Sequence, residues 1–548
     1  MTTLKLPKLS AIQDEKAREG FMLLLNLVEE LKAENQQLRE TVQKLKNENA
    51  RLKGEQGQPP VKPPPPPKNY SSEKERSEKK QRRKRSKRNT IRIDREEVLR
   101  VERAELPTDA EFKGYDEVVV QDLVVRTDNV LFRKEIFHSA SEGKTYRAEM
   151  PPGYQGSFGP GVRALVIALY YGGQMSGPKT LEFLHSFGIE MSSGTLSNFL
   201  NKNQDDFHAE KDAVYQAGLN SSPWQHIDDT GTRVKGEARY CHIVCNPLYT
   251  VYHTLPSKDR LTIIDVLCNQ RERVFRLNDE ALVYLERMRF SAVNRQRLQR
   301  LPRDENLTAE ALDRLLNEHL PDLGPQQHKW VLDALAVAAY HHQTEWPVID
   351  LLIADDAAQF KWVTEKLALC WVHEGRHYKK LTPFIPRHRW LLNRFLKQFW
   401  DFYRDLQAYR RTPTADERTR LTERFDQLFS TVTYYDLLDE RIAKTRNKKD
   451  ALLLVLDYPD IPLHNNPAEL GARARVRKRL VSFGPASPDG VQAWDTFMSL
   501  AATTQKLGIS FYHYTLDRIS QAQQIPSLAS LITQRASELN LASSWPPS

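Results

Sequence analysis

Three acidic residues far apart in the chain stand in settings that suit metal-dependent phosphodiester chemistry: Asp228, Asp355 and Glu469. Asp228 follows the apolar-leaning start of PWQHIDDTGTRV, and Asp355 follows the apolar core of DLLIADDAAQF. Glu469 lies in HNNPAELGARARVRKRL, the start of a predicted arginine-rich helix. Mg²⁺ prefers carboxylate oxygens, and two such ions can activate a nucleophile and stabilise a leaving oxygen. The three positions form a candidate site for two divalent ions, Mg²⁺ or Mn²⁺.

Each of these carboxylates also has an ordinary structural explanation. An aspartate after a strand commonly caps a turn or the following helix. Glu469 would stand at the third position of a helix capped by Asn466, where a carboxylate completes a capping box. Only a folded domain could bring residues 228, 355 and 469 together. The residues by themselves leave both interpretations open.

The elements that carry the two aspartates are predicted strands. We expect Thr230 and Gly231 to end the first strand, and two further runs rich in β-branched and aromatic residues follow, Glu237–Asn246 and Pro247–Leu255. These three runs predict an antiparallel meander. The charged, helical pattern of Leu261–Gln343 predicts an insertion between two strands that we expect to be neighbours in one sheet.

Other helical patterns surround the predicted sheet. TLEFLHSFGIEMSSGTLSNFL predicts two short helices, the second capped by Ser192 or Ser193, as either a helix-turn-helix or an ordinary helical hairpin. A long amphipathic helix from about His388 to Arg411 is rich in aromatic residues, which we expect in a core. Strand-like runs such as Glu117–Arg126 occur in the charged segment before these helices.

Leucines recur every seven residues near the N-terminus and predict a parallel two-stranded coiled coil. The other seam of the repeat contains two asparagines, which cost stability but fix the register and disfavour trimers. We therefore expect a homodimer formed through this repeat: Leu24, Leu31, Asn35, Leu38, Leu45, Asn49 and Leu52.

A proline-rich stretch, PPVKPPPPPK, separates the heptads from a strongly basic block. The chain has a formal net charge of +9, and the block supplies most of this surplus. A basic block favours a polyanionic partner, although a solvated linker has the same composition. The basic block follows the heptads in the chain, which excludes a bZIP factor, because in that class the basic helix precedes the zipper. The expected DNA-binding residues here are Lys79, Lys80, Arg82, Arg83, Lys84, Arg85, Lys87 and Arg88.

Cysteine content and hydropathy exclude two other classes of protein. Four cysteines in 548 residues argue against a secreted disulfide scaffold, and we expect Cys241 and Cys245 to be small buried residues. No apolar run approaches the roughly 18 residues needed to span a bilayer, and the first ten residues lack the apolar core of a signal peptide. We therefore expect a soluble, intracellular protein with no membrane partner.

Four motifs in order give the chain a family resemblance: DDTGTRV, LLIADDAAQF, CWVHEGRHYKKL and LHNNPAELGARARVRKRLVSFG. From about residue 159 to 519 the chain resembles the insertion-sequence 66 transposases, bacterial DDE enzymes with an RNase H-like catalytic domain. Asp228 matches the Asp that begins the family's D-[DE]-T-G motif. Asp355 matches the second Asp, five residues before an aromatic residue, and Glu469 matches the Glu after paired asparagines.

The resemblance implies that the protein cuts double-stranded DNA at element ends and joins it to target DNA. Asp228, Asp355 and Glu469 would be its catalytic and metal-binding residues. We expect phosphate contacts from basic residues on the same helix: Arg473, Arg477 and Lys478. Accessory proteins encoded nearby and a cytoplasmic, nucleoid-associated location in a bacterium are also implied.

The sequence departs from the family pattern at three places. No cysteine occurs between residues 89 and 159, where members often carry a zinc-binding segment. Asp229 stands where Glu is more usual, and the helical insertion enlarges the spacing between the two aspartates. A DNA-binding relic without cleavage activity, or a structure-selective nuclease of the same fold, would share most of these features. A carboxylate-pair hydrolase is poorly supported, because it would need neither the heptads nor the basic block.

Together these patterns predict an α/β fold with an RNase H-like mixed sheet, preceded by a helical region and an N-terminal parallel coiled coil. The expected parts are a coiled coil (1–54), a proline-rich and basic linker (55–90), a small module (91–158), a helical region (159–215), a catalytic core (216–260 and 346–519), a helical insertion (261–345) and a tail (520–548).

Overall fold

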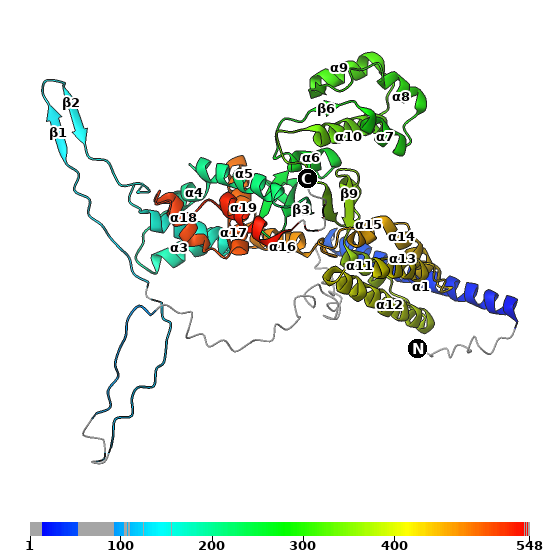
Figure 1. The fold of residues 1–548 in the computed structure, drawn as a ribbon, viewed down its shortest axis with the longest axis horizontal. Helices are drawn as coiled ribbons and strands as arrows, with labels where there is room; N and C mark the ends of the chain where they lie inside the picture. The colour runs from blue at the N-terminus through cyan, green and yellow to red at the C-terminus, as the bar shows by residue number, and fades with distance from the viewer. Residues whose placement is uncertain are drawn as a thin grey trace. The chain divides into compact units, whose positions relative to one another are not determined.

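The computed structural model describes residues 14–52, 93–102, 107, 110–123, 125–154, 156–541, 543 and 545. The predicted proline-rich and basic linker, with its block from Lys79 to Arg88, lies outside the described residues. The chain divides into two compact units, 1–59 with 148–183 and 191–548, and 60–147 with 184–190. Figure 1 shows the elements in chain order by colour.

A five-stranded mixed sheet organises the larger unit, in the order β5-β4-β3-β8-β9; its strands β3 and β9 are labelled in Figure 1. Its strands are β3 (Trp224–Val234), β4 (Glu237–Cys245), β5 (Thr250–Leu255), β8 (Leu351–Ala354) and β9 (Lys366–Leu369). β3, β4 and β5 pair antiparallel, which confirms the predicted meander, while β8 pairs parallel with both β3 and β9. Cys241 and Cys245 are fully buried on β4, as expected.

β3 is longer than predicted, because it continues through Thr230 and Gly231 to Val234. Its pairing with β4 is unbroken to its end, so cross-strand hydrogen bonds outweigh the weak strand preference of glycine. Lys235 and Gly236 form the turn with φ of 51° and 86°. Two positive φ values are typical of the tight turns that match strand twist. The expectation that the strand ends at Gly231 is therefore wrong.

Helix α17 (Pro488–Leu507) closes the outer edge of β5. Alternate N–H groups of β5 donate to side-chain oxygens spaced four residues apart on α17: Thr250 to Thr503 (3.2 Å), Tyr252 to Ser499 (3.0 Å) and Thr254 to Asp495 (2.7 Å). Two strand residues and four helical residues advance by similar distances, about 6.7 Å and about 6 Å, so the two rows stay in step. A free strand edge invites pairing with other chains, and α17 covers this one.

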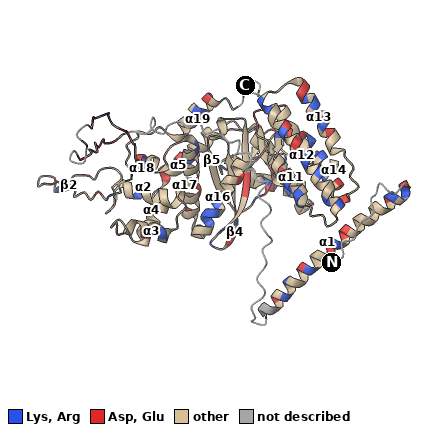
Figure 2. Cartoon of the chain, turned by 90° about the horizontal axis from the view of Figure 1, so that it is seen from below, with Lys and Arg blue, Asp and Glu red and all other residues tan. Residues whose placement is uncertain are grey.

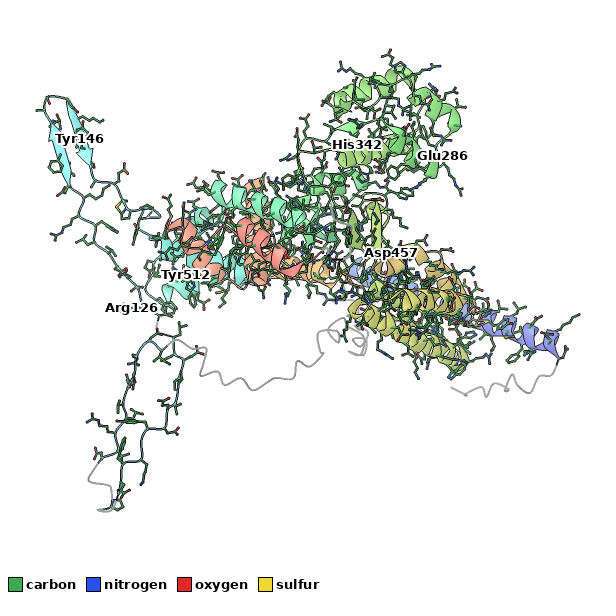
Figure 3. The ribbon with its side chains drawn as sticks, viewed as in Figure 1. Arg126, Tyr146, Glu286, His342, Asp457 and Tyr512 are labelled. Atoms are coloured by element: carbon green, nitrogen blue, oxygen red, sulfur yellow. The ribbon has the colours of Figure 1, made fainter. Side chains whose placement is uncertain are left out.

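The chain between β5 and β8 is mostly helical, in agreement with the predicted pattern. It contains α6 (Arg260–Leu267), α7 (Asp279–Arg287), α8 (Ala292–Leu298), α9 (Ala309–His319), α10 (Pro325–His342) and a two-residue strand pair, β6 (Phe275–Arg276) with β7 (Asn306–Leu307). Glu286 and His342 mark it in Figure 3. Arg260 joins it to the core, because its guanidinium pairs with buried Asp333 (2.8 Å) and donates to the Lys361 carbonyl (2.9 Å).

A second helical group follows β9. It consists of α11 (Trp371–Lys379), α12 (Pro386–Arg411), α13 (Ala415–Phe429), α14 (Asp436–Arg446) and α15 (Lys449–Leu453), which is followed by a 3₁₀ turn, η8 (Leu454–Leu456). Another 3₁₀ turn, η7 (Ala358–Phe360), lies between β8 and β9 and contacts α6. Most aromatic side chains of α12, including Phe395, Phe399 and Phe402, are buried in one hydrophobic cluster with Trp371. This confirms for most of them that the aromatic residues of the long helix belong to a core, whereas Trp390 is 56% exposed.

The helices before the sheet are α2 (Pro160–Ile167), which continues as a π-helical turn η6 (Ala168–Gly172), α3 (Gly177–His185), α4 (Ser193–Asn201) and α5 (Asp205–Asn220). Two C-terminal helices join them, since α18 (Phe511–Ile519) packs on α2 and α19 (Leu528–Leu539) on α5. Of the two predicted caps of α4, Ser192 is the one used, because its side chain accepts a hydrogen bond from the Thr195 N–H (3.1 Å). DNA contact by α3 and α4 stays a prediction.

The N-terminal heptads form one long helix, α1 (Glu15–Leu52). Four of the repeated leucines have between 49% and 59% of their surface exposed: Leu24, Leu31, Leu38 and Leu45. A different side of α1 is buried, where Met22, Leu25 and Glu29 face the body. The Glu29 carboxylate accepts from the N–H groups of Phe384 and Ile385, and lies 3.3 Å from His388, at the start of α12. Pairing of α1 with a second copy stays a prediction.

The smaller unit contains an antiparallel pair, β1 (Ile136–Ser139) and β2 (Lys144–Arg147), with Tyr146 on β2 labelled in Figure 3. The predicted strand at Glu117–Arg126 is wrong, since its described residues lie in neither strand nor helix. Their large apolar side chains, such as Val120 and Leu123, are exposed, so this run lacks the burial that stabilises a strand. Among the described helices, none combines the length and apolar character of a membrane span.

Candidate active site

Asp228, on β3, and Asp355, the first residue after β8, are brought together by the pairing of these two neighbouring strands. In the parallel pairing of β3 with β8, His226 stands opposite Ile353. Each aspartate lies two residues further along its chain, so the register that aligns this pair also aligns the carboxylates. Adjacent strands are about 4.8 Å apart. The sheet therefore brings together two acidic residues that are 127 positions apart (228 to 355).

Burial and negative neighbours raise the pKa of Asp228 to about 7. Burial is the larger cause, and the charges of Asp355, Asp229 and Glu469 add to it. One hydrogen bond opposes the shift, because the Asp229 N–H donates to the Asp228 carboxylate (2.8 Å). A carboxyl group with such a raised pKa marks a place where negative charge is in excess and a cation would be favoured.

In each of the adjacent pairs, Asp228–Asp229 and Asp355–Asp356, the second aspartate has polar or cationic partners of its own. Asp229 accepts from the Gln359 amide (2.9 Å) and lies 3.6 Å from the Lys258 ammonium. Asp356 pairs with Lys361 and Lys448 at 3.0 Å and 2.6 Å. The two pairs thus divide their roles, since the first member of each faces the shared site and the second fixes surrounding segments.

Helix α16 (Asn466–Ser482) carries Glu469 and packs closely on the sheet. A Cβ on Gly471 would come within 2.8 Å of the Ile243 side chain, so only glycine permits this approach. The Tyr252 hydroxyl donates to the Gly471 carbonyl (3.3 Å) at the same contact. Glu469 therefore reaches the strands through a helix that lies directly on β4.

Asn465, the residue before α16, ties the helix to the strand that bears Asp228. Its side-chain amide donates to the Ile227 carbonyl (2.7 Å), and its carbonyl oxygen accepts from the His226 ring (2.9 Å). Burial lowers the pKa of His226 to about 3, so this ring is neutral at physiological pH. The Asn465 N–H also donates to the Cys370 sulfur (3.2 Å). Sequence reasoning placed Asn465 only within a motif and missed His226.

The capping box predicted for Glu469 is not formed. The N-cap of α16 is Asn465 rather than Asn466, so Glu469 stands one position later than expected. Its carboxylate is turned instead to Arg376 of α11, which donates two hydrogen bonds of 2.9 Å and 2.7 Å. Arg473 lies 3.6 Å away on the other side. Arg376 was missed as a site residue, although it lies in the motif CWVHEGRHYKKL.

The basic residues predicted on α16 differ in their exposure. Arg473 is half exposed and Arg477 is exposed, on the side of the helix that carries Glu469. Figure 2 shows Lys and Arg on α16 in blue. The basic block from Lys79 to Arg88 falls outside the described residues.

Lys478 is a correction to the predicted DNA-binding set, because it is fully buried. Nine residues after Glu469, it points from the opposite side of an ideal helix. Its ammonium donates to the Met175 carbonyl (2.8 Å) and the Ser482 hydroxyl (2.9 Å), and lies 3.2 Å from the centre of the Tyr170 ring. Burial lowers its pKa to about 7. Lys478 therefore stabilises the packing of α16 and is not available to a phosphate.

The carboxylates fit a hard divalent cation in part. Asp228 on β3 and Asp355 directly after β8 offer carboxylate oxygens, which are the donors that a hard divalent cation prefers. Across the described ranges no three acidic, histidine or cysteine side chains are gathered tightly enough to ligate one ion. Glu469 is instead paired with Arg376 through two hydrogen bonds, so its carboxylate already has a cationic partner.

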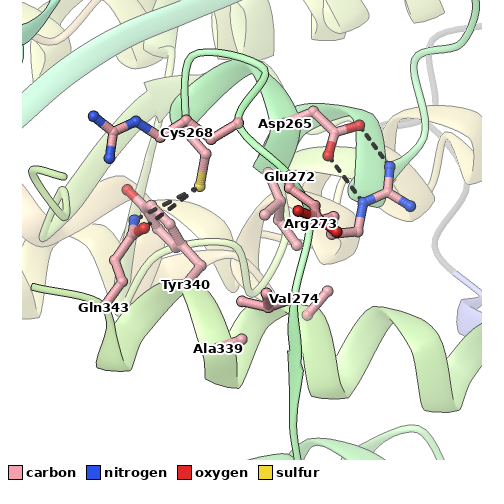
Figure 4. Close-up of a pocket in the computed structure, with 11 residues that line it drawn as sticks. Asp265, Cys268, Glu272, Arg273, Val274, Ala339, Tyr340 and Gln343 are labelled. Carbon is pink, nitrogen blue, oxygen red and sulfur yellow. Dashed lines mark hydrogen bonds and ion pairs between the residues drawn. The ribbon is translucent and has the colours of Figure 1, made fainter. Parts of the chain in front are cut away.

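A small pocket between α6 and α10 lacks the features of an active site (Figure 4). Its polar groups are already paired, since Arg273 donates to both oxygens of Asp265 (2.9 Å and 2.5 Å) and the Gln343 amide contacts the Cys268 sulfur (3.6 Å). The carboxylates described above do not line it.

Comparison with known proteins agrees with this geometry. A family model described as "Transposase IS66 family" matches residues 155–280 and 341–493. These ranges contain all three carboxylates and leave out residues 281–340, which are most of the helical insertion. An uncharacterized protein, y4jO of Sinorhizobium fredii, is 34% identical over 341 residues, which are 59% of this chain and 100% of that relative. The chain belongs to the IS66 family of transposases, which are of the DDE type.

Proposed function

We propose that this protein cuts DNA at the ends of its element and joins them to target DNA, with Asp228, Asp355 and Glu469 as the catalytic carboxylates. The observation that supports the proposal is the register of β3 and β8, because Asp228 on β3 and Asp355 directly after β8 each lie two residues beyond the aligned pair His226 and Ile353. The close packing of α16 at Gly471 adds the glutamate to them. We further propose that the five-stranded sheet, with Asp228 on its central strand, is an RNase H-like core.

The three carboxylates would together hold two Mg²⁺ or Mn²⁺ ions. When bound, the ions activate the attacking water or 3′-hydroxyl and stabilise the leaving oxygen. Glu469 would join the set by exchanging its contact with Arg376 for a metal contact. The guanidinium of Arg376 would then be free to pair with a DNA phosphate.

Arg473 and Arg477 are proposed to hold backbone phosphates next to the carboxylates. They lie one and two turns beyond Glu469 on the same side of α16, about 6 Å and 12 Å along the helix axis. Phosphate contacts of this kind fix the position of DNA without reading its sequence. The block from Lys79 to Arg88 would add nonspecific, salt-dependent affinity.

The proposal includes a homodimer through α1, accessory proteins encoded nearby and a cytoplasmic, nucleoid-associated location. The dimer rests on the exposed heptad leucines of α1. The accessory proteins and the location rest on membership of the family alone.

The test uses labelled duplexes from the DNA flanking the gene, incubated with Mg²⁺ or Mn²⁺ and a second, unlabelled duplex. Wild type is expected to cut at the 3′ end and to join that end to the second duplex. Asp355→Asn and Glu469→Gln should abolish both steps. Asp229→Asn is the matched control, because it changes a neighbouring carboxylate that pairs with Gln359 and Lys258. It should keep cutting if it folds, as a melting curve would show.

Two other outcomes would replace the proposal. Metal-dependent cutting without joining would identify a nuclease of the same fold. Tight DNA binding without cutting, even after addition of the products of neighbouring genes, would identify a DNA-binding protein derived from a transposase. Cutting that survives in Asp355→Asn would show that the carboxylates have been misassigned.

A further inference from the structure

The C-terminal end of α16 carries an exposed apolar tip formed by Leu480, Val481 and Phe483. The exposed fractions of these side chains are 70%, 45% and 90%. Among the described large apolar side chains Phe483 is the most exposed. Packing within the free protein therefore does not explain an aromatic residue at this position.

The backbone at Phe483 is also unfavourable for its side chain. Phe483 follows the last residue of α16 with φ of 60°, in the left-handed region that favours glycine. Gly484 comes next and also has a positive φ, of 90°. A bulky residue held in this conformation without burial points to a role in binding, because strain of this kind is retained where function requires it.

The tip continues the side of α16 that carries the catalytic glutamate. Glu469, Arg473, Arg477 and Leu480 follow one another at steps of four, four and three residues, which places them on one side of a helix. Leu480 lies about 16 Å and Phe483 about 21 Å from Glu469 along the axis. One strand of a duplex advances 3.4 Å per base, so this distance corresponds to about five or six base pairs.

Two contacts fix the tip relative to Asp228. The Arg479 guanidinium donates to the Gly231 carbonyl of β3, three residues beyond Asp228. A Cβ on Gly484 would stand 3.0 Å from the Arg233 carbonyl of the same strand. The tip and the carboxylates are therefore mounted on the same two elements, β3 and α16.

We propose that Leu480 and Phe483 form a wedge that inserts between base pairs of the bound DNA end, within about six base pairs of the cleaved phosphate. The partner is DNA rather than protein, because the exposed arginines Arg473 and Arg477 lead from the carboxylates to the tip. Leucine and phenylalanine are among the residues that unstack base steps and kink a duplex. The inference rests on the proposed function of the site and adds a DNA-distorting contact to it.

The experiment uses the full-length protein in EDTA, so that binding is measured without cutting. The probes are duplexes from the element end with 2-aminopurine at each of the first ten positions in turn. Wild type should raise the fluorescence at one or two adjacent positions, where a base is unstacked. Phe483→Ala should lose this signal and bind the intact duplex about 10- to 100-fold more weakly, since stacking of an aromatic side chain on a base contributes about 1–3 kcal/mol.

A mismatch or abasic site at the reporting position provides the decisive comparison. It removes most of the cost of unstacking, so Phe483→Ala should bind this probe to within about threefold of the affinity of wild type for the intact duplex. Arg477→Ala should bind both probes more weakly and show a salt slope smaller by about 1.

Val432→Ala is the matched control, because Val432 is another exposed apolar residue (66%), and it should behave as wild type. Phe483→Gly should bind as weakly as Phe483→Ala while melting at or above the temperature of wild type.

Three results would overturn the wedge. Wild type could bind without a fluorescence change at any position, or Phe483→Ala could bind intact and mismatched duplexes as wild type does. Phe483→Ala could also lower self-association of the protein and leave DNA distortion unchanged, which would make the tip a protein interface. If one of these results is obtained while wild type still cuts and joins DNA in Mg²⁺ and Asp355→Asn does not, only the wedge proposal fails and the proposed function stands. The proposed function itself fails if wild type neither cuts nor joins.

Discussion

The paired aspartates show how one residue type serves two purposes at adjacent positions. Asp228 faces other carboxylates and has a raised pKa, whereas Asp229 has an amide and an ammonium group as partners. Alternation along β3 causes the difference, since successive side chains of a strand point to opposite sides. The same division occurs at the second pair, where the partners of Asp356 are Lys361 and Lys448.

The raised pKa of Asp228 predicts a pH-dependent effect of Asp228→Asn on stability. Between its unfolded pKa of 3.8 and its folded pKa of about 7, the folded state binds more protons. Stability of the metal-free protein therefore falls as pH rises through this range, and at pH 8 the group is charged in an unfavourable place. Asp228→Asn should stabilise the protein at pH 8 by on the order of 1–3 kcal/mol and have little effect below pH 4.

Melting temperatures measured in EDTA at several pH values would check this prediction. Asp229→Asn is the control and should show no gain at pH 8, because its carboxylate has favourable partners. An equal effect of Asp228→Asn at all pH values would contradict the assigned cause.

Arg376→Gln is predicted to strengthen metal binding in the absence of DNA. The substitution removes a positive charge and frees the Glu469 carboxylate, which Arg376 now holds by two hydrogen bonds. We expect the Kd for Mn²⁺ to fall by about three- to tenfold, which corresponds to about 1 kcal/mol. Titration calorimetry would measure it. Arg473→Gln is the control and should change the Kd less, because Arg473 is half exposed and 3.6 Å from the carboxylate. Weaker Mn²⁺ binding by Arg376→Gln would contradict the competition.

At the scale of elements, helices rather than further strands complete the sheet. α17 supplies acceptors to three N–H groups of β5, and α16 lies on β4 at Gly471. The first contact protects an edge and the second positions Glu469. Because both helices follow the sheet in the chain, the C-terminal part of the core is required for the sheet as well as for the site.

Thr503→Val tests the contribution of α17 to the edge of β5. The substitution keeps the shape of the side chain and removes the oxygen that accepts from the buried Thr250 N–H. An unsatisfied buried donor costs about 1–3 kcal/mol, and urea denaturation should show a loss of that size. Thr504→Val is a matched control, because Thr504 is also fully buried but its hydroxyl only donates to a carbonyl of its own helix. Equal losses in the two variants would contradict a special role for the edge contact.

At the scale of the whole molecule, α1 has one surface that contacts the body and a separate, exposed seam. The body holds Met22, Leu25 and Glu29, which lie outside the seam of the heptad repeat. The leucines of the seam remain exposed. Binding of α1 to its own body and pairing with a second α1 are therefore compatible.

The double substitution Leu31→Lys with Leu38→Lys is predicted to convert a dimer to a monomer. Two charges in the seam would face their copies in a parallel coiled coil and would remove its central apolar layers. Sedimentation equilibrium should give twice 63.4 kDa for wild type and 63.4 kDa for the variant. The same changes at Gln36 and Gln37, outside the seam, should leave the dimer intact. A monomeric wild type would show that the exposed leucines have another use.

The sequence was sufficient to predict the meander and the long helices, because strand composition and heptads are local features, whereas the role of the three carboxylates stays a prediction. It could not show how Arg376 meets Glu469, since that contact joins α11 to α16 and depends on packing. The burial of Lys478 could not be predicted for the same reason. A lysine in an arginine-rich helix is expected to be exposed, and its burial depends on packing. The end of β3 was predicted too early, because cross-strand pairing outweighs the tendency of glycine to end a strand.

The register that aligns Asp228 with Asp355 has a consequence for how the protein is made. Ribosomes add roughly 5–20 residues per second, so Asp355 is synthesised roughly 6–25 s after Asp228, and Glu469 follows after a similar interval. Until then the central strand lacks its parallel neighbour and the nascent sheet has an open edge. A chain released early would retain α1 and the basic block but lack part of the site. If the proposed dimer and DNA contacts are correct, such a fragment would pair with intact chains and compete for DNA, and activity would then require complete synthesis of every chain.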